Sequence, residues 1–169
     1  MRWAVLLTAV GAMIATTGQA AAQDRKAELG KLVFGLCPKL LDGSVLLTDP
    51  GQLSVLGFTA MSPRETPSGN YPRVEQGTGP SRIVLSANAD TCSVWFGGPD
   101  NPTAAGGIME QAYAAKFKGG SPQHLGDGTL VFFLKQQESG QTVTIILADA
   151  GGQLDVTPAT TVIVMKEKR

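Results

Sequence analysis

The sequence predicts an α+β fold in which an antiparallel sheet of five to six strands is packed by two main helices. Three observations indicate this fold. Two long segments repeat apolar residues at helical spacing, several short segments have the residue pattern of strands, and short turns join neighbouring strand segments. Strands joined by short turns run antiparallel. The expected order is helix, short helix, two or three strands, helix and three strands, and the length of 169 residues suits one domain.

Residues 1–22 have the composition of a signal peptide. Arg2 gives a positive start, a short apolar run follows, and Ala20 and Ala22 form a small-residue cleavage site. The apolar run is shorter than the about 20 residues that span a bilayer. We therefore expect cleavage after Ala22, a single mature domain over 23–169, no stable membrane insertion after cleavage, and a periplasmic or secreted location. An uncleaved N-terminal anchor is the alternative.

The sequence contains two cysteines, Cys37 and Cys92, both on predicted apolar faces. In an oxidising compartment an even pair predicts a disulfide. Closing so long a loop would stabilise the fold by about 4 kcal/mol in the chain-entropy model. The alternative is two separate buried thiols that act as small hydrophobic side chains. A redox role is not expected, because the sequence has no C-x-x-C motif.

The first main helix is expected over 24–41, where every position of the i, i+3, i+4, i+7 pattern is apolar. Pro38 interrupts it, because proline lacks the N–H that would bond to the carbonyl of Phe34. We therefore predict a kink or a split there. Asp49 and Pro50 open a short second helix, since Asp is a favoured N-cap and Pro is favoured at the first helical position.

Residues 59–82 are rich in proline and glycine and predict a long loop, with a short edge strand near 71–75. Arg64, Tyr71 and Arg73 are residue types that favour the recognition of partners, so this proline-rich loop is a candidate binding segment. The alternative is a flexible, solvated loop.

The remaining elements follow in order. Strands are expected over 82–87, 91–97, 129–135, 142–148 and 160–166, and the second main helix over 102–118.

The last three predicted strands are largely apolar on both faces. An antiparallel sheet with one wet face should instead alternate apolar and polar residues. Something must therefore cover the second face: a helix on each side, a sheet curled onto itself, a partner chain or a ligand. If this face binds a protein partner, a second copy or a small apolar ligand, we expect Trp95, Phe133, Ile163 and Met165 to contribute.

Signatures of catalysis, metal binding and nucleotide binding are absent from the sequence, so no metal or cofactor is expected. The one histidine, His124, has only Asp127 nearby, and no G-x-S-x-G motif accompanies it. Walker and dinucleotide-binding motifs are also missing. Glu110 on the second main helix is the carboxylate best placed to act in a cleft.

Composition and charge narrow the function classes. Lys and Arg number 14 against 14 Asp and Glu, and no block of like charges occurs. Nucleic acid and anionic membrane surfaces are therefore poor partners. The preferred hypothesis is an exported, non-catalytic binding protein of the bacterial envelope, for a protein partner or a small apolar ligand. This class includes inhibitors and immunity-type proteins. The alternative is a small envelope hydrolase that uses carboxylates in a groove.

Overall fold

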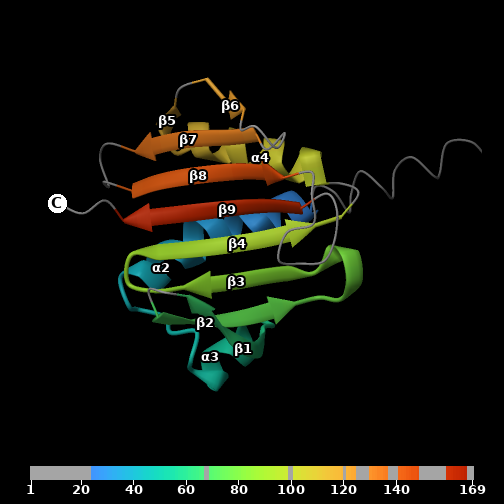
Figure 1. Ribbon diagram of the computed structural model, residues 1–169, viewed down its shortest axis with the longest axis vertical. Coiled ribbons are helices and arrows are strands. Elements are labelled where there is room, and N and C mark those ends of the chain that lie inside the picture. Colours follow the sequence, from blue (N-terminus) through green and yellow to red (C-terminus); the bar gives the residue numbers. More distant parts are fainter. Residues whose placement is uncertain are drawn as a thin grey trace, which may run out of the picture.

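The computed structural model describes residues 24–66, 69–98, 101–119, 121–124, 130–136, 141–148 and 159–166, and confirms the α+β class (Figure 1). The predicted leader lies outside these residues. The strands form one antiparallel sheet in the order β1-β2-β3-β4-β9-β8-β7-β5, with β6 also paired to β7. The strands are β1 Thr59–Thr66, β2 Gly69–Gln76, β3 Ile83–Ala87, β4 Thr91–Gly97, β5 Lys118–Gly119, β6 Gln123–His124, β7 Leu130–Gln136, β8 Gln141–Ala148 and β9 Ala159–Lys166.

The first main helix is continuous but changes its hydrogen-bond register at Pro38. Residues 24–30 are α-helical, η1 (Lys31–Leu36) is a π-helix, and α2 (Cys37–Leu41) is again α-helical. The N–H of Cys37 donates to the carbonyl of Leu32, five residues back, as a π-turn requires. Pro38 has no N–H to donate, and it directly follows the π-helical turn at which the hydrogen-bond register changes.

The start of α3 and the end of α4 are set by local backbone geometry. In α3 (Pro50–Val55), the side chain of Asp49 accepts hydrogen bonds from the N–H groups of Gly51 and Gln52, which confirms the predicted start. The helix α4 (Asn101–Ala114) ends earlier than the predicted 118. Lys116 adopts a left-handed conformation, with φ of 64°, and the chain then turns into β5.

The prediction of a loop over 59–82 is wrong, apart from the short strand expected near 71–75, which lies within β2. The strands β1 and β2 form a hairpin there, followed by the short 3₁₀ helix η2 (Gly79–Ser81). The prolines fit where the ladder is already interrupted. Pro63 lies at the register shift between Met61 and Arg64 on the edge strand β1, and Pro72 lies opposite that shift. At a bulge on an edge strand, a missing N–H removes no regular ladder bond.

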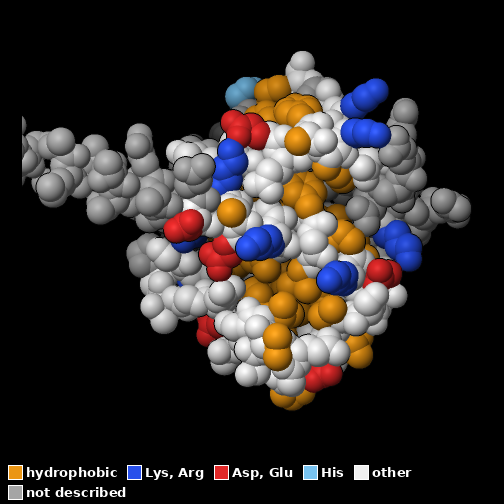
Figure 2. Space-filling model, turned by 180° about the vertical axis from the view of Figure 1, so that it is seen from behind, with side chains coloured by type: hydrophobic (Ala, Val, Ile, Leu, Met, Phe, Trp, Pro, Cys, Tyr) orange, Lys and Arg blue, Asp and Glu red, His pale blue; other side chains and the backbone are white. Residues whose placement is uncertain are grey.

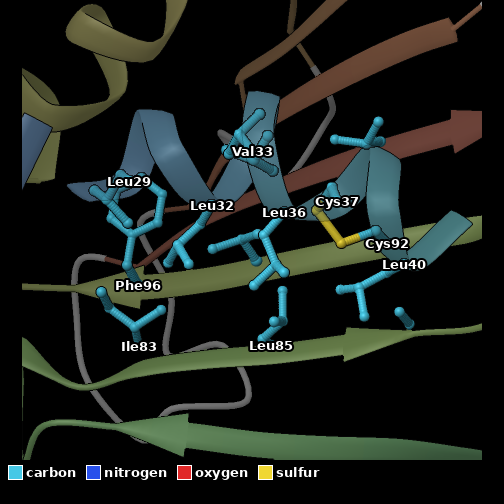
Figure 3. Packing of buried hydrophobic residues seen from close by; sticks show 14 of the residues in the cluster. Leu29, Leu32, Val33, Leu36, Cys37, Leu40, Ile83, Leu85, Cys92 and Phe96 are labelled. Atoms are coloured by element: carbon cyan, nitrogen blue, oxygen red, sulfur yellow. A yellow bond between two sulfur atoms is a disulfide. The ribbon is translucent and has the colours of Figure 1, made fainter. Parts of the chain in front are cut away.

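The hydrophobic core lies between the sheet and the helices, which both cover the same face (Figure 1). Leu32 and Leu36 from the first helix point toward Ile83 and Leu85 of β3 (Figure 3). From α4, Ile108 joins the same cluster. Of the alternatives for covering the second face, a helix on each side is therefore wrong, and that face receives neither of the two main helices.

A disulfide joins Cys37 at the start of α2 to Cys92 of β4, with 5.5 Å between the Cα atoms, as predicted (Figure 3). Both cysteines are fully buried. The bond ties the first helix to the middle of the sheet.

Polar contacts fix the beginning of the first helix. The guanidinium of Arg25 donates to the carbonyl of Gly97 at 2.5 Å and to that of Ser81 at 3.3 Å. Lys26 forms an ion pair with Glu110 of α4, and its carbonyl accepts a hydrogen bond from the Gln111 side chain. These contacts hold the helix against both the sheet and α4.

Candidate binding face

The sheet face that carries no described helix is the candidate functional site, here termed the helix-free face (Figure 1). In an antiparallel pair, residues opposite one another lie on the same face. The register pairs Met61 with Arg73, Arg73 with Ser86, Ser86 with Ser93 and Ser93 with Ile163. This row crosses the sheet from the edge strand β1 to the central strand β9.

The structure places most of the predicted binding residues on this face, on separate strands. Strand alternation places Tyr71 beside Arg73, Trp95 beside Ser93, and Met165 beside Ile163. Phe133 of β7 lies on the same face farther along the sheet, and 47% of its side chain is exposed. Arg64 is opposite Tyr71 in the register, and its side chain lies outside the described part. These residues come from separate strands, and only the sheet register unites them.

A small apolar cluster forms the centre of the helix-free face. Val84 is fully buried and Trp95 is 8% exposed, and Met61 packs against this pair. Thr161 lies opposite Trp95 on β9 and is partly exposed. The face therefore combines an apolar centre with hydroxyl-bearing neighbours.

Two charged residues of β2 on this face, Glu75 and Arg73, differ in whether they have a partner. Glu75 on β2 lies 3.5 Å from the guanidinium of Arg82, so this carboxylate has a cationic partner. Arg73, two residues earlier on the same strand, has a buried Nε with no hydrogen-bond partner. The acidic residue nearest to Arg73 along β2 is thus already engaged by another arginine.

A second surface feature lies on the helix side, where Figure 2 shows exposed apolar side chains. It is a hollow of about 470 Å³ between the end of α2, the segment leading to α3, and the β3–β4 turn. Leu46 lines it and is 53% exposed, while Leu40 and Leu47 form buried parts of its wall. Sequence reasoning did not find this hollow, because its walls come from segments far apart in the chain.

One carboxylate lies at the hollow, and its titration is perturbed. Asp42 accepts hydrogen bonds from the hydroxyl and the backbone N–H of Ser44. These bonds favour the ionised form and lower the pKa of Asp42 below its ordinary value of 3.8, with smaller contributions from Lys166 and Lys39.

Two of the residues considered for catalysis, Glu110 and His124, lie in the described part of the chain. Glu110 is exposed on α4 and forms an ion pair with Lys26. His124 is exposed on β6, and Asp127 lies outside the described residues. Within the described ranges, no three His, Cys, Asp or Glu residues gather as a metal site. No helix among those ranges is both long and apolar enough to cross a membrane.

No protein-family model, curated protein or solved structure matches this chain.

Proposed function

We propose that this chain is an exported, non-catalytic binding protein of the bacterial envelope that contacts a partner protein through its helix-free face. The observation that carries the proposal is that Tyr71, Arg73, Trp95, Phe133 and Met165 all lie on that one face of the sheet. Aromatic residues, Met and Arg are the types enriched where proteins bind one another.

The form of the surface supports a protein rather than a small ligand as partner. The hollow described above is lined from the helix side, by residues such as Leu40, Leu46 and Asn88. The helix-free face presents strands side by side, with partly exposed Ile163 and Met165 near its centre. A broad sheet surface of this kind suits a wide contact with another protein surface.

Export is supported by the buried disulfide, since such bonds persist in oxidising compartments. It is tested by the intact mass of the protein recovered from the envelope fraction. We expect a chain that begins at Gln23 and is two hydrogens lighter than the reduced form. A chain that retains Met1 and two thiols would contradict export.

Site-specific photo-crosslinking tests the binding face. A benzophenone amino acid replaces Phe133, on the helix-free face, or Tyr113, an aromatic residue on α4 with a similar exposure of 51%. We expect a discrete protein adduct from position 133 and none from position 113. A further Ile163→Glu change should abolish the adduct from position 133 while the disulfide still forms.

Three outcomes would count against the proposed face. Equal adducts from both positions would indicate non-specific contact. Insensitivity of the adduct to Ile163→Glu would place the contact elsewhere. A low-mass adduct at position 133 would identify a small molecule as the occupant instead of a protein.

A further inference from the structure

We infer that the partner presents a carboxylate to Arg73, on a segment that also places an apolar side chain over the centre of the helix-free face. This inference rests on the proposed function and specifies the chemistry of the partner. The carboxylate is that of an Asp, a Glu or a chain terminus in the partner protein.

The first argument is the unequal pairing of charges on β2. Glu75 is the acidic neighbour that Arg73 would use in its own strand, at the next position on the same face. That carboxylate is held by Arg82 at 3.5 Å. No ion pair or hydrogen bond to the Arg73 side chain exists in the described part of the chain. Arg73 is therefore a cation on this face without a counter-charge.

The second argument is the desolvation of the Arg73 side chain. The residue is only partly exposed, and its Nε is buried without an acceptor. A cation that folding has already partly desolvated loses less hydration when it pairs with an anion. Arginine offers parallel N–H donors that match the two oxygens of a carboxylate. A carboxylate bound to the terminal N–H groups would thus pair with a side chain that is already partly removed from water.

The third argument is the apolar surface next to the guanidinium. In the register, Arg73 lies opposite Met61, and Met61 packs against the pair of Val84 and Trp95. On the other side Arg73 lies opposite Ser86, whose neighbour across the sheet is Ser93. A cation bordered by apolar side chains and small hydroxyls suits an acidic residue followed or preceded by an apolar one.

Selection from a random 12-residue peptide library displayed on phage tests the inference on the mature, oxidised protein. We expect the enriched peptides to share an Asp or Glu adjacent to an apolar residue. Their affinity should fall about tenfold or more for Arg73→Gln, since a charge-assisted hydrogen bond is lost. Arg73→Lys should retain part of it, and replacement of the acidic residue of the peptide by its amide should mimic Arg73→Gln.

The matched control is Lys31→Gln, which removes an exposed cation from η1 on the helix side. This variant should bind the selected peptides as the wild type does. Circular dichroism and the disulfide mass would show that each variant is folded. Acidic peptides that depend on Arg73 and not on Lys31 would support the inference.

Other outcomes would overturn it. Neutral apolar peptides that depend on Ile163 but not on Arg73 would remove the inference and leave the proposed face standing. Peptides insensitive to both positions would remove the inference and the proposed face together. Stronger competition by inorganic phosphate than by acetate would refute the carboxylate assignment. A wild-type dimer that Arg73→Gln dissociates would identify a second copy as the occupant.

Discussion

At the scale of single residues, the described structure assigns distinct tasks to side chains that look alike in the sequence. Arg25 anchors the first helix through backbone carbonyls, Arg82 neutralises Glu75, and Arg73 has neither task. The difference comes from position in the tertiary structure. The sequence indicated Arg73 as a recognition residue by its residue type alone. The pairing of the neighbouring charges, which distinguishes Arg73 from Arg25 and Arg82, became visible only in the structure.

Replacement of Arg25 by Ala should destabilise the protein. It removes charge-assisted hydrogen bonds to the carbonyls of Gly97 and Ser81. We expect the free energy of unfolding to fall by about 2 kcal/mol. Lys26→Ala removes an exposed ion pair with Glu110 and should cost less than about 1 kcal/mol. Urea denaturation of the two variants checks this order, and a reversed order would contradict it.

The titration of Asp42 provides a second test at this scale. Because hydrogen bonds from Ser44 lower the folded-state pKa, ionised Asp42 stabilises the fold above pH 3.8, and this contribution is lost as the pH falls through the lower folded-state pKa. We expect the amide resonance of Ser44 to titrate with a midpoint below 3.8. In Ser44→Ala the midpoint of Asp42 should rise. An unchanged midpoint would show that the hydroxyl has no influence.

At the scale of elements, the sequence patterns located the helices and most strands but misread the hairpin of β1 and β2. Helical periodicity depends on local spacing, and it survives the π-turn at Pro38. Proline and glycine indicate a loop wherever they cluster, yet Pro63 and Pro72 occupy interrupted positions of a ladder. Whether a strand lies at an edge is a property of the whole sheet, so composition alone could not reveal it.

The glycines of α4 give a matched prediction for one element. A Cβ at Gly106 would meet no atom within 4 Å, so Gly106→Ala should stabilise the helix by about 0.5–1 kcal/mol. A Cβ at Gly107 would contact the aliphatic part of Lys26 and displace it. Gly107→Ala should therefore gain less than Gly106→Ala. Chemical denaturation of both variants measures the difference, and an equal gain would contradict the packing of Lys26.

At the scale of the whole molecule, the described helices cover one face of the sheet and leave the other without any of them. The apolar character of both faces of the last strands was readable from the sequence, and so was the candidate set of Trp95, Phe133, Ile163 and Met165. Which face the helices would cover was not readable. That choice depends on long-range contacts such as those of Ile108 in α4, which no local pattern encodes.

Removal of the disulfide tests the stability of the whole fold. The bond closes a loop of 55 residues between Cys37 and Cys92. The double variant Cys37→Ala, Cys92→Ala should lose about 2–4 kcal/mol of unfolding free energy, because the unfolded chain is no longer constrained. Thermal and urea denaturation measure the loss. A variant as stable as the wild type would show that the bond adds little to the packed core.

The position of β9 between β4 and β8 has a consequence for how the chain folds. Of the described strands, the one that joins the two halves of the sheet comes last in the sequence. Until β9 inserts, β4 and β8 each lack one hydrogen-bonded neighbour. The sheet is therefore completed by contacts between distant parts of the chain. Pairing across the centre of the sheet is therefore a long-range step, and we expect this step to limit how fast the chain folds.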